Sequence, residues 1–209
     1  MRKLIQLLAA GALALSVTAC SGKKAADEIS ETVNGFFETL EAGDYENAET
    51  YLSGSAKESF AAVIQQAKNV EQLFDGISLN QEDKDKLSGL MKNMIGASFK
   101  NHQVKEAEKG EDNIYTVNVT VDVMETIDVK EMLNSADINT LLPDEAFDKA
   151  AEINESDGQE AATAYLIGLI LDQIKVLYQQ KIDSASYTSS SRTLTCEKIE
   201  GSWKITGIN

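Results

Sequence analysis

The chain has 209 residues and carries 19 Lys and Arg against 34 Asp and Glu, which gives a formal net charge of −15. This length suits one domain of generous size, and the negative charge argues against nucleic acid as a partner, because phosphates are bound by Lys and Arg. The single histidine, His102, and the two cysteines, Cys20 and Cys196, leave few side chains for nucleophilic, metal or redox chemistry.

Residues 1–19 have the organisation of a secretory signal peptide. A basic start, Met1-Arg2-Lys3, precedes an apolar run from Leu4 to Leu15 that only Gln6 interrupts, and small residues follow up to Cys20. The run is too short for a membrane-spanning helix, which needs about 20 apolar residues. One interpretation is an ordinary signal peptide, which leaves Cys20 as a free thiol.

The other interpretation rests on the segment Leu15-Ser16-Val17-Thr18-Ala19-Cys20, which resembles the lipobox of bacterial lipoproteins. Val17 and Thr18 stand where leucine and alanine or serine are commoner. The resemblance implies cleavage between Ala19 and Cys20, a covalent diacylglycerol (with palmitate among its acyl chains) on Cys20, and anchoring at the extracytoplasmic face of the cell membrane. Two or more acyl chains are needed for stable anchoring. We expect residues 20–26 to be the lipidated cysteine and a short tether.

The mature chain keeps a strong negative charge. Removal of residues 1–19 takes away Arg2 and Lys3 and leaves 17 basic against 34 acidic residues. This charge favours solubility; a cationic ligand or metal ion is the alternative reading.

Residues 27–95 show the spacing of four helices. Gly43 ends the first helix, Asp44 is placed to cap the second, Ser55 and Glu58 form a capping-box pattern at the start of the third, and Asn80 is placed to cap the fourth. The apolar positions that carry this pattern are Ile29, Val33, Phe36, Phe37, Leu40, Ala48, Tyr51, Leu52, Phe60, Val63, Ile64, Ala67, Val70, Phe74, Leu87, Leu90, Met91, Met94 and Ile95.

The pattern then changes to a period of two over residues 98–124, which predicts strands. Phe99–Glu106 alternates weakly, whereas Ile114–Met124 places Tyr115 and four valines on one face and polar residues on the other. We expect one buried and one solvated face of the sheet.

Residues 127–183 predict a helical insertion between strands. Two short helices are expected at Val129–Leu133 and Asp144–Ile153, with Pro143 in a first-turn position. The longer stretch Glu160–Lys181 contains no charge from Ala161 to Leu171, and we expect this helix to be buried and to cover the sheet. A partner-binding or self-association surface is the alternative.

Strands close the chain over residues 186–208, with a turn at Glu200-Gly201. The Ser/Thr-rich run from Ser184 to Thr195 is typical of the polar face of a strand, and hydroxyls that bind a sugar or peptide are the alternative. The whole order predicts a single α+β domain over residues 27–209. We expect a curved antiparallel sheet of about four strands packed on the N-terminal helices.

Two segments resemble nuclear-transport-factor-2-like (cystatin-like) domains, which small bacterial lipoproteins of unknown function commonly carry. These segments are residues 36–52, with Gly43-Asp44-Tyr45 and Tyr51-Leu52, and the terminal residues 201–205. The resemblance implies a cone formed by a curved sheet around the first helices. Five aromatic side chains would face the inside of that cone, as core or as pocket lining: Phe36, Phe37, Tyr51, Tyr115 and Trp203.

No catalytic constellation accompanies this resemblance. Catalytic relatives pair Asp and His in the cone, and His102 lies on a weakly patterned strand, where we expect a structural role. Cys196 alternates with Leu194 as a small buried residue does. The segment Glu155–Glu160 fails as a calcium loop, because with Gly158 in sixth place the first and twelfth positions are Ile153 and Ala164. We expect no catalytic residue, no metal and no cofactor other than the lipid.

The function expected from the sequence is therefore non-catalytic binding of a small molecule, a peptide or an envelope protein at the membrane surface. The first alternative is a structural or assembly protein that uses the apolar helix over residues 161–178 as an interface. A transporter's solute-binding component is less favoured, because such receptors need two lobes, and an enzyme of the same cone fold comes last.

Overall fold

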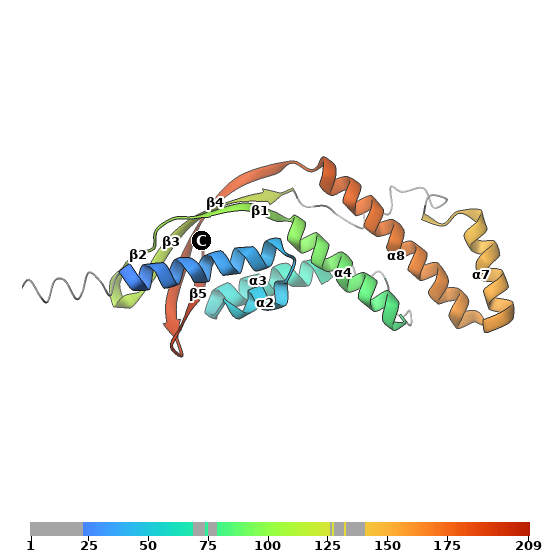
Figure 1. Ribbon diagram of the computed structural model, residues 1–209, viewed down its shortest axis with the longest axis horizontal. Coiled ribbons are helices and arrows are strands. Elements are labelled where there is room, and N and C mark those ends of the chain that lie inside the picture. Colours follow the sequence, from blue (N-terminus) through green and yellow to red (C-terminus); the bar gives the residue numbers. More distant parts are fainter. Residues whose placement is uncertain (1–22, 69–73, 75–78, 126, 128–131, 133–140) are drawn as a thin grey trace, which may run out of the picture.

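The computed structural model describes residues 23–68, 74, 79–125, 127, 132 and 141–209. Ala19 and Cys20 lie outside these residues, as does nearly all of the helix expected at Val129–Leu133. The described elements follow in this order (Figure 1): a helix over residues 23–41, α2 (Tyr45–Thr50), α3 (Gly54–Lys68), α4 (Gln81–Ala97), β1 (Phe99–Val104), β2 (Glu108–Lys109), η2 (Glu111–Asn113), β3 (Tyr115–Met124), α7 (Asp144–Asp157), α8 (Gln159–Ser184), β4 (Tyr187–Ile199) and β5 (Ser202–Ile208).

The α+β class and the helical insertion between strands are confirmed. The sheet is antiparallel in the order β1-β3-β4-β5, with the two-residue β2 paired to β3. β3 and β4 pair without interruption from Tyr115↔Cys196 to Met124↔Tyr187, although α7 and α8 lie between them in the sequence. The insertion therefore leaves the sheet and returns to it at the same end.

One face of the sheet packs on the first helix and on α3, as the alternation of β3 predicts. Val117, Val119 and Leu194 are almost completely buried there. Their neighbours in this first core include Ile29, Val33, Phe36, Phe37, Leu40, Phe60, Ile64, Cys196 and Ile205. On the other face the register pairs Thr116 with Thr195, Asn118 with Thr193 and Thr120 with Ser191. Thr188, Ser190 and Arg192 pair with Val123, Val121 and Val119, so the Ser/Thr run supplies only part of that polar face and also places polar side chains on the valine face.

The predicted helix ends are confirmed at two caps and wrong at a third. The carboxylate of Asp44 accepts a hydrogen bond from the Asn47 backbone N–H, and the Asn80 side chain accepts one from Asp83 N at 2.8 Å. Ser55 does not cap α3, which begins one residue earlier at Gly54. The Ser55 hydroxyl instead donates to the Thr206 carbonyl at 2.9 Å, so it ties α3 to β5.

The expected tether is shorter than residues 20–26. The first helix is already formed at residue 23, and Ala26 is buried in the first core. Apolar contact with the sheet therefore extends the helix into the segment that the sequence assigns to a linker.

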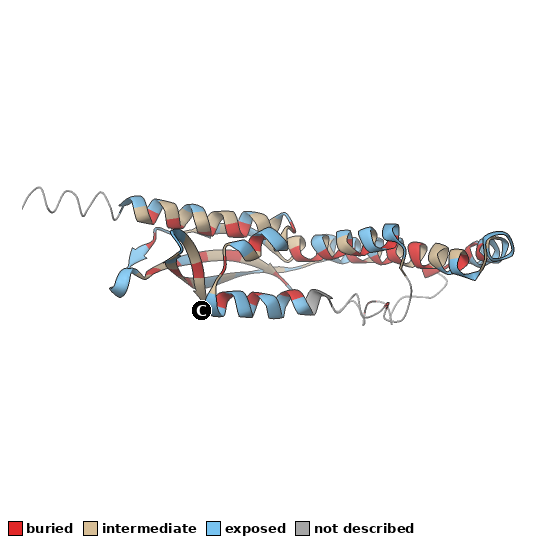
Figure 2. Cartoon of the chain, turned by 90° about the horizontal axis from the view of Figure 1, so that it is seen from below, coloured by how far each residue is buried: buried red, intermediate tan, exposed pale blue. Residues whose placement is uncertain are grey.

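The position expected for the long apolar helix is wrong. α8 does not cover the sheet but packs side by side with α4, and both extend away from the sheet as an arm (Figures 1 and 2). The pairs Lys86–Asp172 and Asn93–Gln179 show that the two helices run in the same direction. They share a second core with Met124 from β3, made of Phe74, Leu87, Leu90, Met94, Met132, Ile167, Leu171, Ile174 and Tyr178.

α8 is also longer than its charge-free run. It has 26 residues, and its most apolar 18-residue window has a mean hydropathy of 1.3, so by length and composition alone it is long enough to cross a membrane. A helix packed within a domain meets the same test, and α8 packs on α4 through Ile167, Leu171 and Ile174. A third of the residues in the window are buried, most of its other apolar residues are partly buried, and Val176 is exposed.

The end of the first helix and α4 come close enough for their backbones to meet. The helix ends in a Schellman motif, in which Gly43 N donates to Leu40 O and Asp44 N donates to Thr39 O, both at 2.8 Å. Gly43 has a φ of +72°, and a Cβ there would lie 2.2 Å from Lys92 O. A Cβ at Gly96 of α4 would lie 3.0 Å from Glu41 O and from Gly43 N.

We predict opposite effects for two glycine-to-alanine changes in α4. Gly96→Ala forces the backbones apart and lowers the free energy of unfolding by about 1–3 kcal/mol. Gly89→Ala raises it by up to about 1 kcal/mol, because alanine favours a helix and no atom lies within 4 Å of a Cβ there. Urea unfolding followed by circular dichroism measures both. A stabilising Gly96→Ala would contradict the close approach.

Candidate functional site

The five aromatic residues expected in the cone belong to the first core or border it. Phe36, Phe37 and Tyr115 are buried, whereas Tyr51 and Trp203 are partly buried against the core. Phe36 and Phe37 meet edge-to-face at 5.1 Å, as do Tyr115 and Trp203 at 5.2 Å. These side chains fill the space between helix and sheet, and the pocket that we consider as a binding site is lined by other residues.

That pocket lies where the two cores meet and has a volume of about 260 Å³. We call it the junction pocket. Phe60 and Ile64 reach it from the first core, and Met94, Met124 and Tyr178 reach it from the second. Its remaining lining residues are Val63, Ile95, Ser98, Phe99, Val123 and Ile127. The pocket is thus built from α3, α4, the strands β1 and β3, and α8.

The junction pocket offers apolar contact and no charge. None of its described lining residues is ionised at neutral pH. Tyr178 is the one among them with a titratable side chain; its pKa is high in itself, and burial raises that pKa further, to about 12. The hydroxyl of Ser98 is already used, since it donates to the Met94 carbonyl at 2.7 Å. Pockets for whole drug-sized ligands measure roughly 300–1,000 Å³. This volume therefore suits one apolar group, such as a large side chain or part of a small molecule.

A second concavity follows the arm between α4 and α8 and measures about 900 Å³. We call it the arm groove. Leu90, Leu171 and Ile182 contribute apolar surface, and its charged lining residues carry both signs: Glu41, Glu82, Asp85, Lys86, Lys92, Asp172 and Lys175. Lys86 bridges to Asp172 at 3.0 Å and to Glu82 at 3.5 Å. Because its described lining holds four acidic and three basic side chains, the charge of the groove does not clearly favour an anion or a cation.

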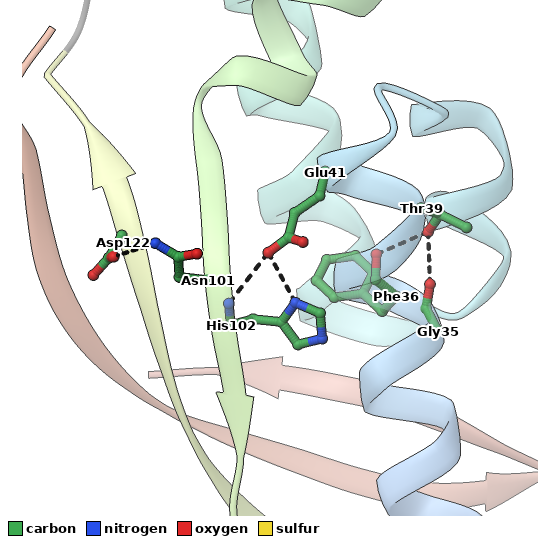
Figure 3. Close-up of polar contacts among 7 residues, drawn as sticks. All are labelled: Gly35, Phe36, Thr39, Glu41, Asn101, His102 and Asp122. Atoms are coloured by element: carbon green, nitrogen blue, oxygen red, sulfur yellow. Dashed lines mark hydrogen bonds and ion pairs between the residues drawn. The ribbon is translucent and has the colours of Figure 1, made fainter.

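His102 forms a polar contact that the sequence does not reveal (Figure 3). Its Nδ1 lies 2.8 Å from Glu41 Oε1, and its backbone N–H donates to the same oxygen at 3.2 Å. The imidazole ring also stacks on Phe37, with centroids 5.4 Å apart and planes 18° apart. Glu41 is the last residue of the first helix, 61 positions away in the sequence, and no spacing signal connects the two residues.

A β-bulge presents His102 to Glu41. The register of β1 against β3 shifts between Lys100 and Gln103, and Asn101 adopts a left-handed φ of +56°. The Asn101 amide donates to the Asp122 carboxylate at 3.0 Å, which stabilises the bulge (Figure 3). Glu41 thereby accepts a hydrogen bond from a backbone N–H group at the outer edge of β1. An edge with unpaired N–H groups could otherwise pair with a strand of another chain. The geometry gives His102 a part in joining the sheet to the first helix.

The described residues do not assemble a metal or thiol centre. They contain no group of three or more His, Cys, Asp or Glu side chains able to hold a metal ion. Cys196 is completely buried, and burial raises the pKa of its thiol to about 12, so the reactive thiolate is not formed at neutral pH. The interpretation of Cys196 as a small buried residue is confirmed.

No protein-family model, curated protein or solved structure matches the chain. The resemblance of residues 36–52 and 201–205 to cystatin-like domains stays a prediction.

We predict that Glu41→Ala lowers the free energy of unfolding by about 1–3 kcal/mol, because the His102 ring and backbone N–H both lose their acceptor in a partly buried position. Glu38→Ala is the matched control, since Glu38 lies exposed on the same helix. Its effect should stay within about 0.5 kcal/mol. Equal effects in urea unfolding would show that the contact contributes nothing beyond helix propensity.

Proposed function

We propose that the protein is a lipid-anchored, extracytoplasmic binding protein of the cell envelope, and that the junction pocket holds an apolar group of its ligand. The observation that carries the binding site is a neutral pocket of about 260 Å³ between two cores. The signal-like residues 1–19 and the lipobox-like Cys20 support the proposed location at the membrane surface. The binding is non-catalytic, and turnover of an envelope substrate that is lost on His102→Ala would overturn this part.

Lipidation of Cys20 would hold the domain close to the bilayer. Only residues 21 and 22 separate Cys20 from the described first helix, and a chain of that length spans at most about 11 Å. The first helix begins at one end of the long axis of the molecule, and the turn between α7 and α8 lies at the other end (Figure 1). In this arrangement the arm extends away from the anchored end.

The ligand of the junction pocket is best described by its chemistry. An apolar group gains roughly 25 cal/mol for each Å² removed from water, and no lining charge has to be desolvated for it. Two methionines, Met94 and Met124, adapt to different shapes because their side chains are unbranched and flexible. A small molecule, a peptide or an envelope protein that presents one apolar group fits this description.

A second candidate function, assembly through α8, also has an observation in its favour. A third of the apolar window of α8 is buried, most of its other apolar residues are partly buried, and Val176 on this helix is 48% exposed. Phe147 on the neighbouring α7 is exposed as well. Sedimentation at increasing concentration separates the two proposals, because self-association through this face raises the sedimentation coefficient.

We predict that Cys20→Ala abolishes membrane attachment. Cells grown with a labelled palmitate analogue should label the wild-type protein and not the variant, and fractionation should move the variant from the membrane to the soluble fraction. If the variant stays on the membrane, another segment holds it there. If both chains remain unlabelled, Cys20 is not lipidated.

We predict that filling the junction pocket weakens binding of a neutral apolar probe, N-phenyl-1-naphthylamine. In the unlipidated Cys20→Ala chain, Val63→Trp should raise the Kd at least about tenfold, which corresponds to about 1.4 kcal/mol. Val176→Trp is the matched control, because Val63 and Val176 are helical valines exposed by 46% and 48%, and only Val63 lines the pocket. An unchanged Kd for Val63→Trp would remove the pocket as the binding site.

A further inference from the structure

Asp83 is a buried carboxyl group in the contact between the two arm helices. It lies in the first turn of α4 and is only 2% exposed. In the described part of the chain, it is the only charged residue that is buried. Its backbone N–H is satisfied by the Asn80 side chain at 2.8 Å. Its side-chain Oδ2 is buried and has no hydrogen-bond partner among the residues that the structure describes.

In the described part of the chain, no cation forms an ion pair with this carboxyl group. Gly168 of α8 faces the side chain, since a Cβ at Gly168 would lie 3.4 Å from Asp83 Oδ1 and 3.5 Å from Lys86 Nζ. Lys86 is the nearby cation, but its ammonium group bridges to Asp172 and Glu82. The charged groups that act on Asp83 are therefore Lys86 and Glu82 from α4 and Asp172 from α8.

Ionisation of this carboxyl is costly in the closed contact. A buried carboxylate needs hydrogen bonds or a paired cation to offset lost hydration, and the described residues supply neither to Oδ2 of Asp83. Burial raises the pKa of Asp83 and is the largest effect. The Asn80 backbone hydrogen bond and Lys86 act in the opposite direction, and Glu82 and Asp172 raise the pKa further.

We propose that Asp83 is a protonation-controlled latch between α4 and α8. The contact at the distal half of the arm is tight while the carboxyl is neutral, and it loosens when the carboxyl ionises and seeks water. Because Lys86 and Asp172 line the arm groove beside it, loosening this contact widens the distal end of that groove. The latch makes the shape of the arm respond to the acidity of its surroundings.

The direction of the pH dependence follows from the raised pKa. The folded form binds the proton more strongly than the open form does, so the protonated carboxyl contributes stability that is fully present below the ordinary pKa of 3.8. That contribution is lost as the pH rises through the raised folded pKa. Between the two values, the equilibrium constant for opening increases by up to about tenfold per pH unit.

The test is hydrogen exchange, read by mass spectrometry, on the full mature lipidated chain in detergent micelles between pH 3.5 and about 7. After correction for the intrinsic pH dependence of exchange, peptides from residues 81–97 and 159–184 of the wild type should lose protection as the pH rises. Asp83→Asn, which is uncharged and nearly isosteric, should keep its protection constant over the same range.

Asp85→Asn is the matched control, since Asp85 lies exposed on the same helix and contacts Gln81. It should show the wild-type pH dependence. The proposal is overturned if the wild-type arm is equally protected at both ends of the range, whether or not Asp83→Asn folds. It is also overturned if Asp83→Asn retains the wild-type pH dependence of protection, or if Asp85→Asn abolishes that dependence to the same extent as Asp83→Asn.

Discussion

Two backbones come into close contact at Gly43 and Gly96, and the position of the arm depends on this contact. No side chain fits between Gly43 and the Lys92 carbonyl, so α4 crosses the end of the first helix at a fixed point. Glu41, two residues before Gly43, then reaches His102 on β1. Helix, sheet edge and arm are thus joined within a few residues, and the direction in which α4 leaves the sheet follows from that junction.

The arm is an insertion that the sheet tolerates because it leaves and returns at one end. β3 and β4 pair continuously, although α7 and α8 lie between them in the sequence. The second core belongs to the arm, yet Met124 of β3 is part of it. The two cores therefore meet at the end of the sheet, and the junction pocket lies at their boundary, where side chains from five elements have to match in shape.

The proposed functions lie at different positions along the long axis of the molecule. The anchor would lie at the end where the first helix begins, the apolar pocket lies at the junction, and the buried carboxyl of Asp83 lies within the arm. A neutral pocket suits an apolar ligand group, whereas an unsatisfied carboxyl makes helix packing depend on protonation. The first core contains several side chains with no exposed surface, such as Val117 and Leu194, whereas only a third of the apolar window of α8 is buried.

Local chemistry in the sequence was sufficient for most of the described elements and for two of the three predicted helix caps. The caps at Asp44 and Asn80, the alternation of β3 and the turn at Glu200-Gly201 each act within a few residues, so periodicity and capping predict them. The position of α8, the bond from Ser55 to β5, the pair of Glu41 with His102, and the junction pocket were decided only by tertiary structure. Each of these features joins residues far apart in the chain. An apolar stripe predicts that one face of a helix is buried, but it does not identify the surface against which that face packs.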